Sequence, residues 1–312
     1  MLVKIFKQLS NKDVGEAGGK GASLGEMTQN KMPVPTGFVL LASAFDRFLE
    51  ETDLDVEVAA ILKEINYKDI NSVDKASNVI RDLIHDQSVP ADIKKEVLAE
   101  FKKLKTKFVA VRSSATAEDS SVASWAGELE TYLDTTEKNL FVNVKKCWSS
   151  LFTPRAIFYR QEKKMLKNKV SVAVVIQKMI ESEISGIAFT VHPVTRDKNQ
   201  MIIEAGWGLG EAIVSGQVTP DAYVIDKRDL SIIDINIAKQ EMIIIRKAGG
   251  GIKHTVVPRA KQEKQKLNGK QIIELAKICA NIEKHYKKPQ DIEWAFAKGK
   301  FYITQSRPIT TL

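Results

Sequence analysis

Cysteine is scarce in this 312-residue sequence, which contains Cys147 and Cys279 and no CxxC pair. Such a low count argues against a disulfide framework and against the usual cysteine-rich zinc sites. Both thiols are therefore expected to be buried and free. The four histidines stand in unrelated contexts, so no His-based metal site and no nucleophile–base pair is predicted. Structural or surface roles are expected for all four.

Long apolar runs are also missing. The longest, such as residues 172–176, are far too short to span a bilayer, and residues 1–5 carry no signal-like core or cleavage site. There is no low-complexity block and no long Pro/Ser linker, while 44% hydrophobic and 28% charged residues are typical of a soluble globular protein. The expected location is cytoplasmic, with no membrane partner.

Positive charges exceed negative charges only moderately, with a net charge of +8 and a pI near 9.2. The lysines are spread through amphipathic segments such as 91–107 and 259–288 and are not massed with aromatic residues. Solvated helix faces explain them better than a nucleic-acid surface does. A basic balance also suits an anionic ligand such as ATP, but charge alone does not choose between these partners.

The hydrophobic pattern changes character near residue 180. Helical spacing is predicted over residues 44–64, 74–86, 91–105 and 139–164, with a strand over 108–112 and a buried central strand over 172–176. Residues 113–124 are expected to form an extended loop, and 177–183 a polar connection. Short strands dominate afterwards, over 186–190, 201–204, 222–225, 231–235 and 241–246, followed by a helix that Asn268 can cap. The sequence thus predicts a helix-rich part, 1–180, and a strand-rich part, 181–312, with a ligand cleft between them.

A hairpin is expected at the end, with strands over 291–296 and 300–305 joined by the loop 297–299. With this three-residue loop Glu293 and Gln305 share one face of the sheet, whereas a two-residue loop would put them on opposite faces. Paired carboxylate and amide oxygens can hold Mg²⁺ against phosphates. An ordinary exposed strand face is an equally good interpretation of the same pattern. Arg307 would point the same way and can stabilise charge on a transferring phosphoryl group.

Lys20 lies among glycines, in a segment whose missing side chains let backbone N–H groups approach an anion. The segment is not a Walker A motif, because Val14 replaces its first glycine and Gly21 replaces its Ser or Thr. An ordinary glycine-rich turn before a helix is just as plausible. The later segment GWGLGE fails the dinucleotide fingerprint, because Glu211 stands at the third glycine position.

Arg112 ends the predicted strand over 108–112 and begins the Ser/Thr-rich loop, where its guanidinium could be held rigidly against a phosphate. The alternative is a salt bridge to Glu118 or Asp119. Segment 125–131 could fold over a phosphate tail, with Gly127 permitting close approach and Thr131 supplying a hydroxyl, but a structural turn is equally plausible there.

Eight motifs occur in order along the chain: GGKGASLGEM, VPTGFVL, AVRSSATAEDS, SWAGELETYL, SGIAFTVHP, EAGWGLGEAIVSGQVTPD, DIEWA and ITQSRPI. On these motifs the chain resembles, over essentially its full length, the N-terminal ATP-grasp domain of the phosphoenolpyruvate synthase and pyruvate phosphate dikinase family, which includes rifamycin phosphotransferases. The resemblance implies an α+β, ATP-grasp fold whose two subdomains hold the nucleotide in the cleft between them.

The resemblance also implies roles for individual residues. Catalytic roles fall to Lys20, Arg112 and Arg307, which would lie beside the phosphates. The remaining ligands of ATP and Mg²⁺ would be Gly127 and Thr131 in the phosphate loop, Gln177 and Glu181 at the adenine-side hinge, and Glu293 and Gln305 as the metal ligands.

In the family that the chain resembles, a histidine on a separate swivelling domain attacks the β-phosphate of ATP, which gives AMP and a phosphorylated carrier. None of the four histidines here has the Thr/Ser-His-Ala context of that carrier. The expected function is therefore an ATP-binding, phosphoryl-donating part of a phosphoenolpyruvate synthase-like dikinase that needs the histidine domain in cis or in trans. The alternatives are the corresponding part of a rifamycin phosphotransferase and, in another class, a non-catalytic nucleotide-sensing module.

Overall fold

The computed structural model describes residues 1–116, 130–165, 170–247 and 250–310. The chain divides into two compact units, the first made of Met1–Glu26 and Thr36–Met179 and the second of Met27–Pro35 and Ile180–Leu312. The sequence prediction did not include the crossing of residues 27–35 into the second unit, where Ile303 N–H donates to the Pro33 carbonyl at 2.8 Å. The assignment of the units to the two halves of an ATP-grasp fold stays a prediction.

The first unit contains a five-stranded antiparallel sheet in the order β1-β2-β5-β3-β4. Its strands are β1 (Val3–Ile5), β2 (Gly37–Leu40), β3 (Val109–Ala115), β4 (Thr131–Thr135) and β5 (Val172–Lys178). The prediction of a buried central strand at 172–176 is confirmed, because β5 lies in the middle of the sheet. Two boundaries were wrong, since residues 113–115 continue β3 and Gln177 continues β5.

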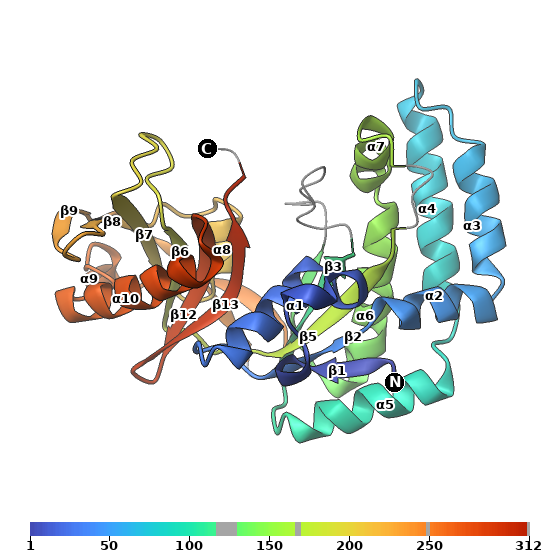
Figure 1. Cartoon of the computed structure of the whole chain (residues 1–312), viewed down its shortest axis with the longest axis horizontal. Coiled ribbons are helices and arrows are strands. Elements are labelled where there is room, and N and C mark those ends of the chain that lie inside the picture. The colour runs from blue at the N-terminus through green and yellow to red at the C-terminus, as the bar shows by residue number, and fades with distance from the viewer. Residues whose placement is uncertain (117–129, 166–169, 248–249, 311–312) are drawn as a thin grey trace. The chain divides into compact units, whose positions relative to one another are not determined.

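Helices pack on this sheet and on one another in an outer layer (Figure 1). They are α1 (Val14–Gln29), α2 (Ala42–Glu51), α3 (Leu54–Lys63), α4 (Ile70–Asp86), α5 (Ala91–Lys103), α6 (Leu140–Ser149) and α7 (Pro154–Glu162). Short 3₁₀ turns occupy Phe6–Gln8, Asn11–Asp13, Glu137–Asn139 and Ser150–Phe152. The single helix predicted over 44–64 is broken, because Asp53 adopts a left-handed φ of 56° between α2 and α3.

The two faces of the first sheet are covered differently. On one face, alternate residues of β5 pack into the main core, where Trp148 of α6 stacks on Phe45 and Phe48 of α2. On the other face lies the glycine-rich part of α1, so close that a Cβ atom on Gly21 would stand 3.1 Å from a methyl group of Val39 on β2. Ser114 of β3, on this second face, meets α1 at Gly18 and Gly21.

The second unit contains a six-stranded antiparallel sheet in the order β13-β12-β6-β7-β8-β9. Its strands are β6 (Ile184–Phe189), β7 (Gln200–Trp207), β8 (Asp221–Asp226), β9 (Ile232–Asn236), β12 (Gln290–Ala297) and β13 (Lys300–Pro308). A separate two-stranded sheet pairs β10 (Met242–Arg246) with β11 (Ile252–Val256), and the sequence prediction missed β11. The helices are α8 (Glu211–Val214), α9 (Arg259–Gln262) and α10 (Gly269–Tyr286).

Helix α10 packs its apolar stripe on the six-stranded sheet, against β7 and β12. Ile272, Leu275 and Cys279 are fully buried on it. The predicted cap is also confirmed, because the Asn268 side chain accepts the Gln271 N–H at 3.0 Å.

The last hairpin has a different loop from the predicted one. Ala297 pairs with Lys300, so the loop has two residues, Lys298 and Gly299, with φ values of 51° and 72°. Two positive φ values are those of a type I′ turn. The expected face-sharing nevertheless holds, because a β-bulge adds Thr304 to β13 and restores the register after the shorter turn. The reasoning from loop length was therefore wrong, although its conclusion agrees with the pairing.

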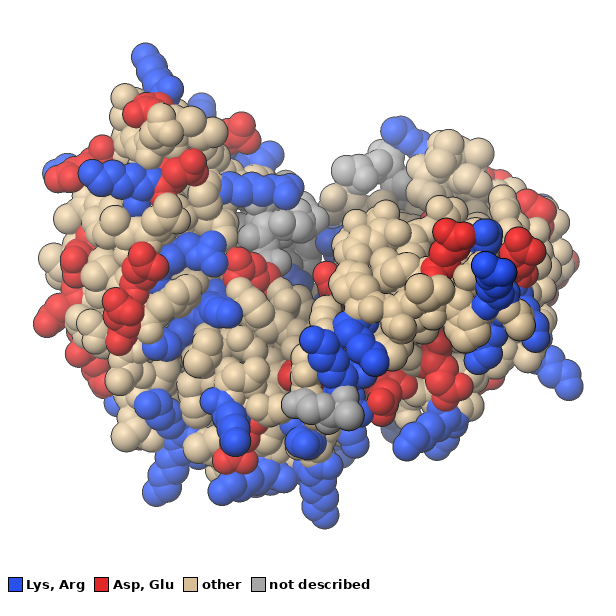
Figure 2. All heavy atoms as spheres, turned by 180° about the vertical axis from the view of Figure 1, so that it is seen from behind, with Lys and Arg blue, Asp and Glu red and all other residues tan. Residues whose placement is uncertain are grey.

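Within the described residues, Cys147 and Cys279 are free and buried, as predicted. No helix in the same ranges is both long and apolar enough to cross a bilayer. Figure 2 shows basic and acidic side chains interspersed over much of the face that it draws, in keeping with solvated helix surfaces.

Candidate functional site

In the first unit, β3 carries Arg112 on the face that meets α1. Arg112 lies directly opposite Thr131 on β4 and Val175 on β5. Directly paired residues of antiparallel strands project from the same face, so the sheet brings Arg112 and Thr131 together. Arg112 is 7% exposed, whereas Thr131 is exposed.

The glycine-rich segment around Lys20, expected to be a phosphate-type loop or a turn before a helix, is helical except at Gly18, with φ 68° and ψ 171°. Lys20 belongs to the first turn after this break. The break rests on β3: a Cβ atom at Gly18 would stand 2.2 Å from Ser114 Oγ, and the Gly21 N–H donates to the same oxygen at 3.2 Å. Ser114 follows Arg112 by two residues in β3 and shares its face, so the turn that contains Lys20 packs on the face of β3 that carries Arg112.

Gln177 lies on the same face of the sheet, on β5, opposite Ala110 and Gly37. Its side chain is 2% exposed, and its Nε2 atom is buried without a hydrogen-bond partner in the described part of the chain. An unsatisfied buried amide costs about 1–3 kcal/mol. This donor fits a ligand that accepts a hydrogen bond, which is consistent with the predicted place of Gln177 beside a nucleotide.

Gly127, another predicted site residue, lies outside the described residues. Glu181 belongs to the second unit, where its mostly exposed carboxylate forms an ion pair of 2.9 Å with Arg246 of β10. Gln177 and Glu181, predicted together at one hinge, thus stand on either side of the division between the units.

In the second unit, Glu293 of β12 lies directly opposite Gln305 of β13, as the metal-site prediction requires. The row continues across the sheet, because Glu293 pairs with Ile187 on β6 and Ile187 pairs with Glu204 on β7. Gln305 is 6% exposed, while Glu293 and Glu204 are half-buried. The sequence prediction missed Glu204, since the strand order that places β6 between β7 and β12 has no local signal.

Arg307 lies in the next row, directly opposite Asp291. Its Nε and Nη2 atoms both donate to Asp291 Oδ2, at 2.9 and 2.8 Å. Asp291 was also missed, although its two-residue spacing from Glu293 indicates the same face. Arg307 therefore projects from the same face as Gln305, as predicted, and its guanidinium is anchored by a carboxylate.

Two acidic groups on this face, Glu204 and Asp291, have raised pKa values, so their charged forms are disfavoured. Burial raises the pKa of Glu204, and the negative charge of Asp291 raises it further. Burial likewise raises the pKa of Asp291, with Glu293 acting in the same direction and Arg307 in the opposite one. A bound cation would offset this repulsion, so the face fits a metal-bound anion better than a bare one.

The described residues contain no group of three or more His, Cys, Asp or Glu arranged to hold a metal ion. Mg²⁺ does not need one, because it is usually held by one or two protein oxygens and takes its other ligands from phosphates and water. Glu293 and Gln305 offer a carboxylate and an amide oxygen of the right kind. The pair therefore fits Mg²⁺ that arrives with a polyphosphate.

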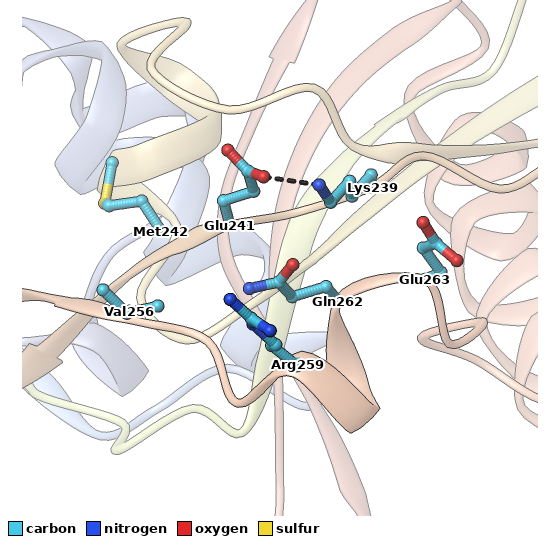
Figure 3. A pocket seen from close by; sticks show the side chains of 7 residues that line it. All are labelled: Lys239, Glu241, Met242, Val256, Arg259, Gln262 and Glu263. Carbon is cyan, nitrogen blue, oxygen red and sulfur yellow. Dashed lines mark ion pairs between the residues drawn. The ribbon is translucent and has the colours of Figure 1, made fainter.

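The second unit also contains a hollow of about 730 Å³ that is separate from the predicted site residues (Figure 3). Its lining residues are Lys239, Glu241, Met242, Val256, Arg259, Gln262 and Glu263. None of the predicted site residues lines it, and its Lys239 and Glu241 neutralise each other in an ion pair of 2.6 Å. Its chemistry favours no particular ligand.

Residues 14–312 match the family described as "Pyruvate phosphate dikinase, AMP/ATP-binding domain". The chain belongs to this family. ATP binding, which the sequence predicts, is therefore the property that the family's description names.

Curated relatives agree with this membership. A probable phosphoenolpyruvate synthase of Methanocaldococcus jannaschii is 47% identical over 98% of this chain and 26% of its own length. Another from Archaeoglobus fulgidus is 46% identical over 100% of this chain and 42% of its own. A rifampicin phosphotransferase of Bacillus subtilis is 37% identical, covering 100% and 36%. The chain thus spans less than half the length of these relatives.

Among solved structures, D-alanine–D-alanine ligase from Helicobacter pylori is similar with a TM-score of 0.30 and 8% identity, over 76% of this chain and 53% of that one. A likeness at this level carries no argument about the fold. The mixed α and β architecture agrees with the predicted class.

Proposed function

We propose that the chain is the ATP-binding, phosphoryl-donating part of a phosphoenolpyruvate synthase-like dikinase with an ATP-grasp fold. In this proposal one Mg·ATP is held by residues of both units. Lys20, Arg112, Thr131 and Gln177 would bind from the first unit, and Glu293, Gln305 and Arg307 from the second.

The observation that supports the proposal most strongly is the convergence on one face of the first sheet. Arg112 and Thr131 lie opposite each other there, and the turn with Lys20 packs on Ser114. Two cations and a hydroxyl on one face form a surface for phosphate oxygens, and the buried amide of Gln177 supplies a donor nearby.

Catalysis by this set consists of positioning and charge neutralisation. When bound, Mg²⁺ would neutralise phosphate charge, and Glu293 and Gln305 would hold it. Lys20, Arg112 and Arg307 would neutralise the remaining phosphate oxygens while a histidine on another domain attacks the β-phosphorus and AMP leaves. Asp291 keeps Arg307 oriented through its two hydrogen bonds.

A second candidate is the same part of a rifamycin phosphotransferase, which the relative from Bacillus subtilis favours by matching the whole chain. Both candidates use the same ATP chemistry and differ in the final acceptor. A non-catalytic sensor of ATP is a third possibility, and it would release no AMP.

Calorimetric titration with ATP tests the proposal. We expect binding that requires Mg²⁺ and that is weakened about tenfold or more in Glu293→Gln, because the variant loses a charged metal ligand. Glu263→Gln, an exposed change in the same unit, should bind like the wild type. The absence of ATP binding by the wild-type chain would refute the proposal.

The donor role needs a second assay. The chain is mixed with a histidine domain from a phosphoenolpyruvate synthase or from a rifampicin phosphotransferase, and AMP release is followed. Mg·ATP binding without AMP release in either mixture would favour the sensor.

A further inference from the structure

The hydroxyl of Ser114 stands where the helix that carries Lys20 begins again after the break at Gly18. The first N–H groups of a helix have no partner within the helix, and a side chain just before it usually supplies one. Gly18 has no side chain. The Gly21 N–H is instead bonded to Ser114 Oγ at 3.2 Å, from a residue 93 positions away in sequence. Ser114 therefore replaces the missing local cap.

The same serine sets the distance between α1 and β3. A Cβ atom at Gly18 would stand 2.2 Å from Ser114 Oγ and 2.3 Å from its carbonyl oxygen, which means that the two backbones are in direct contact. Gly18 has a φ of 68°, so this position needs glycine on both steric and conformational grounds. The turn that holds Lys20 is thereby fixed on β3 at one point.

The neighbouring serine fixes the opposite side of β3. Ser113 donates from its Oγ to the Glu130 carbonyl at 3.0 Å, and its N–H reaches the same oxygen at 3.1 Å. Ser113 and Ser114 are both fully buried and project from opposite faces. After Arg112, one serine thus holds the chain that enters β4 with Thr131, and the next holds the Lys20 turn.

We propose that Ser114 is a positioning residue for phosphate binding, because its bond to the Gly21 N–H fixes the turn of Lys20 beside Arg112. The inference rests on the proposed function and adds a residue to which that function assigns no contact with ATP. Without the hydroxyl the turn would loosen, and the two cations would no longer be held together. Phosphate affinity should then fall while contacts to the nucleoside remain.

The test compares Ser114→Ala with the wild type in calorimetric titrations with Mg·ATP and with adenosine. Loss of one hydrogen bond predicts ATP binding weaker by about three- to tenfold, with adenosine binding unchanged within about twofold. Ser150→Ala is the matched control, because Ser150 is also fully buried in the first unit and its Oγ donates to the Cys147 carbonyl at 2.7 Å. A structural defect alone would lower the affinity for Mg·ATP and for adenosine by similar factors.

Hydrogen exchange supplies an independent measurement, in which the amides of residues 19–25 should exchange faster in Ser114→Ala and not in Ser150→Ala. If the alanine variant does not fold, Ser114→Cys takes its place, since sulfur keeps most of the volume and accepts hydrogen bonds weakly. Equal ATP affinity in wild type and variant, or an equal loss for ATP and adenosine, overturns the inference and leaves the proposed function standing. A wild-type chain that binds no ATP overturns both.

Discussion

Arg112 combines burial with a place on the candidate phosphate-binding face, so its substitution tests that face at the scale of one residue. We expect Arg112→Ala to lower the rate of AMP release, with the histidine domain supplied, by on the order of 10²-fold or more, the usual loss when one transition-state donor is removed. Arg47→Ala removes an arginine of the first unit that pairs with Glu51 and lies outside the candidate site, and it should keep the wild-type rate. A fully active Arg112→Ala protein would remove this residue from the site.

Glu204 gives a prediction for stability as a function of pH. Because its pKa is raised in the folded protein, the folded state binds more protons than the unfolded state above the ordinary pKa of glutamate. The charged carboxylate therefore costs stability as the pH rises through that window and above it. We expect Glu204→Gln, without ATP, to raise the free energy of unfolding at pH 7 by about 0.5–1 kcal/mol.

The sign of this effect is checked by denaturant titration at several pH values. The gain in stability from Glu204→Gln should disappear below about pH 4, where the wild-type glutamate is protonated in both the folded and the unfolded protein. The exposed Glu263→Gln should show no such dependence. A variant less stable than the wild type at pH 7 would mean that the Glu204 carboxylate stabilises this face.

At the scale of elements, the sequence predicted the segments with a clear apolar pattern. Helix α10 repeats its apolar positions over several turns, and β5 begins with a continuous apolar run of mostly β-branched residues, so both were recognised. Strands β1 and β2, of three and four residues, were missed. The break at Asp53 depends on a left-handed conformation, which Asp adopts more often than most residues but which its presence in a sequence does not require.

The candidate site, like the fold, was predicted only in part. Glu293 and Gln305, on the two strands of one hairpin, were predicted on one face, but this holds only because the two-residue turn and the bulge at Thr304, both unpredicted, offset each other. Residues joined by sheet order could not. Glu204 comes next to the pair only through β6, and Ser114 meets Gly21 only because α1 packs on β3.

The hairpin turn offers an element-scale prediction. Lys298 has a φ of 51° at the first position of a type I′ turn, where asparagine is favoured before glycine. Its N–H donates to Glu183 Oε1 at 2.8 Å, and a side-chain replacement keeps this bond. We expect Lys298→Asn to stabilise the protein by about 0.5–1 kcal/mol in thermal unfolding, while Lys300→Asn, within β13, should not.

At the scale of the molecule, each unit has its own means of holding together. The first relies on the large apolar core around Trp148. The second contains a fully buried ion pair, in which Lys266 Nζ lies 2.7 Å from Asp221 Oδ1 and both side chains are inaccessible. Asp221 also accepts the Tyr223 hydroxyl at 2.8 Å and the Ala238 N–H at 3.0 Å. The pair thus joins β8 to the segments that follow β9 and precede α10.

Removing one partner of this pair should damage the second unit selectively. Lys266→Met leaves the Asp221 carboxylate buried without its counter-charge, which typically costs about 3–5 kcal/mol. Hydrogen exchange should rise in β7, β8 and α10 and stay unchanged in β3 and β5, because the lost pair belongs to the core of one unit only. Lys264→Met, at an exposed position nearby, is the control. Combining Lys266→Met with Asp221→Asn should recover part of the loss, since the uncompensated charge is gone, and equal damage in the single and double variants would assign the effect to packing.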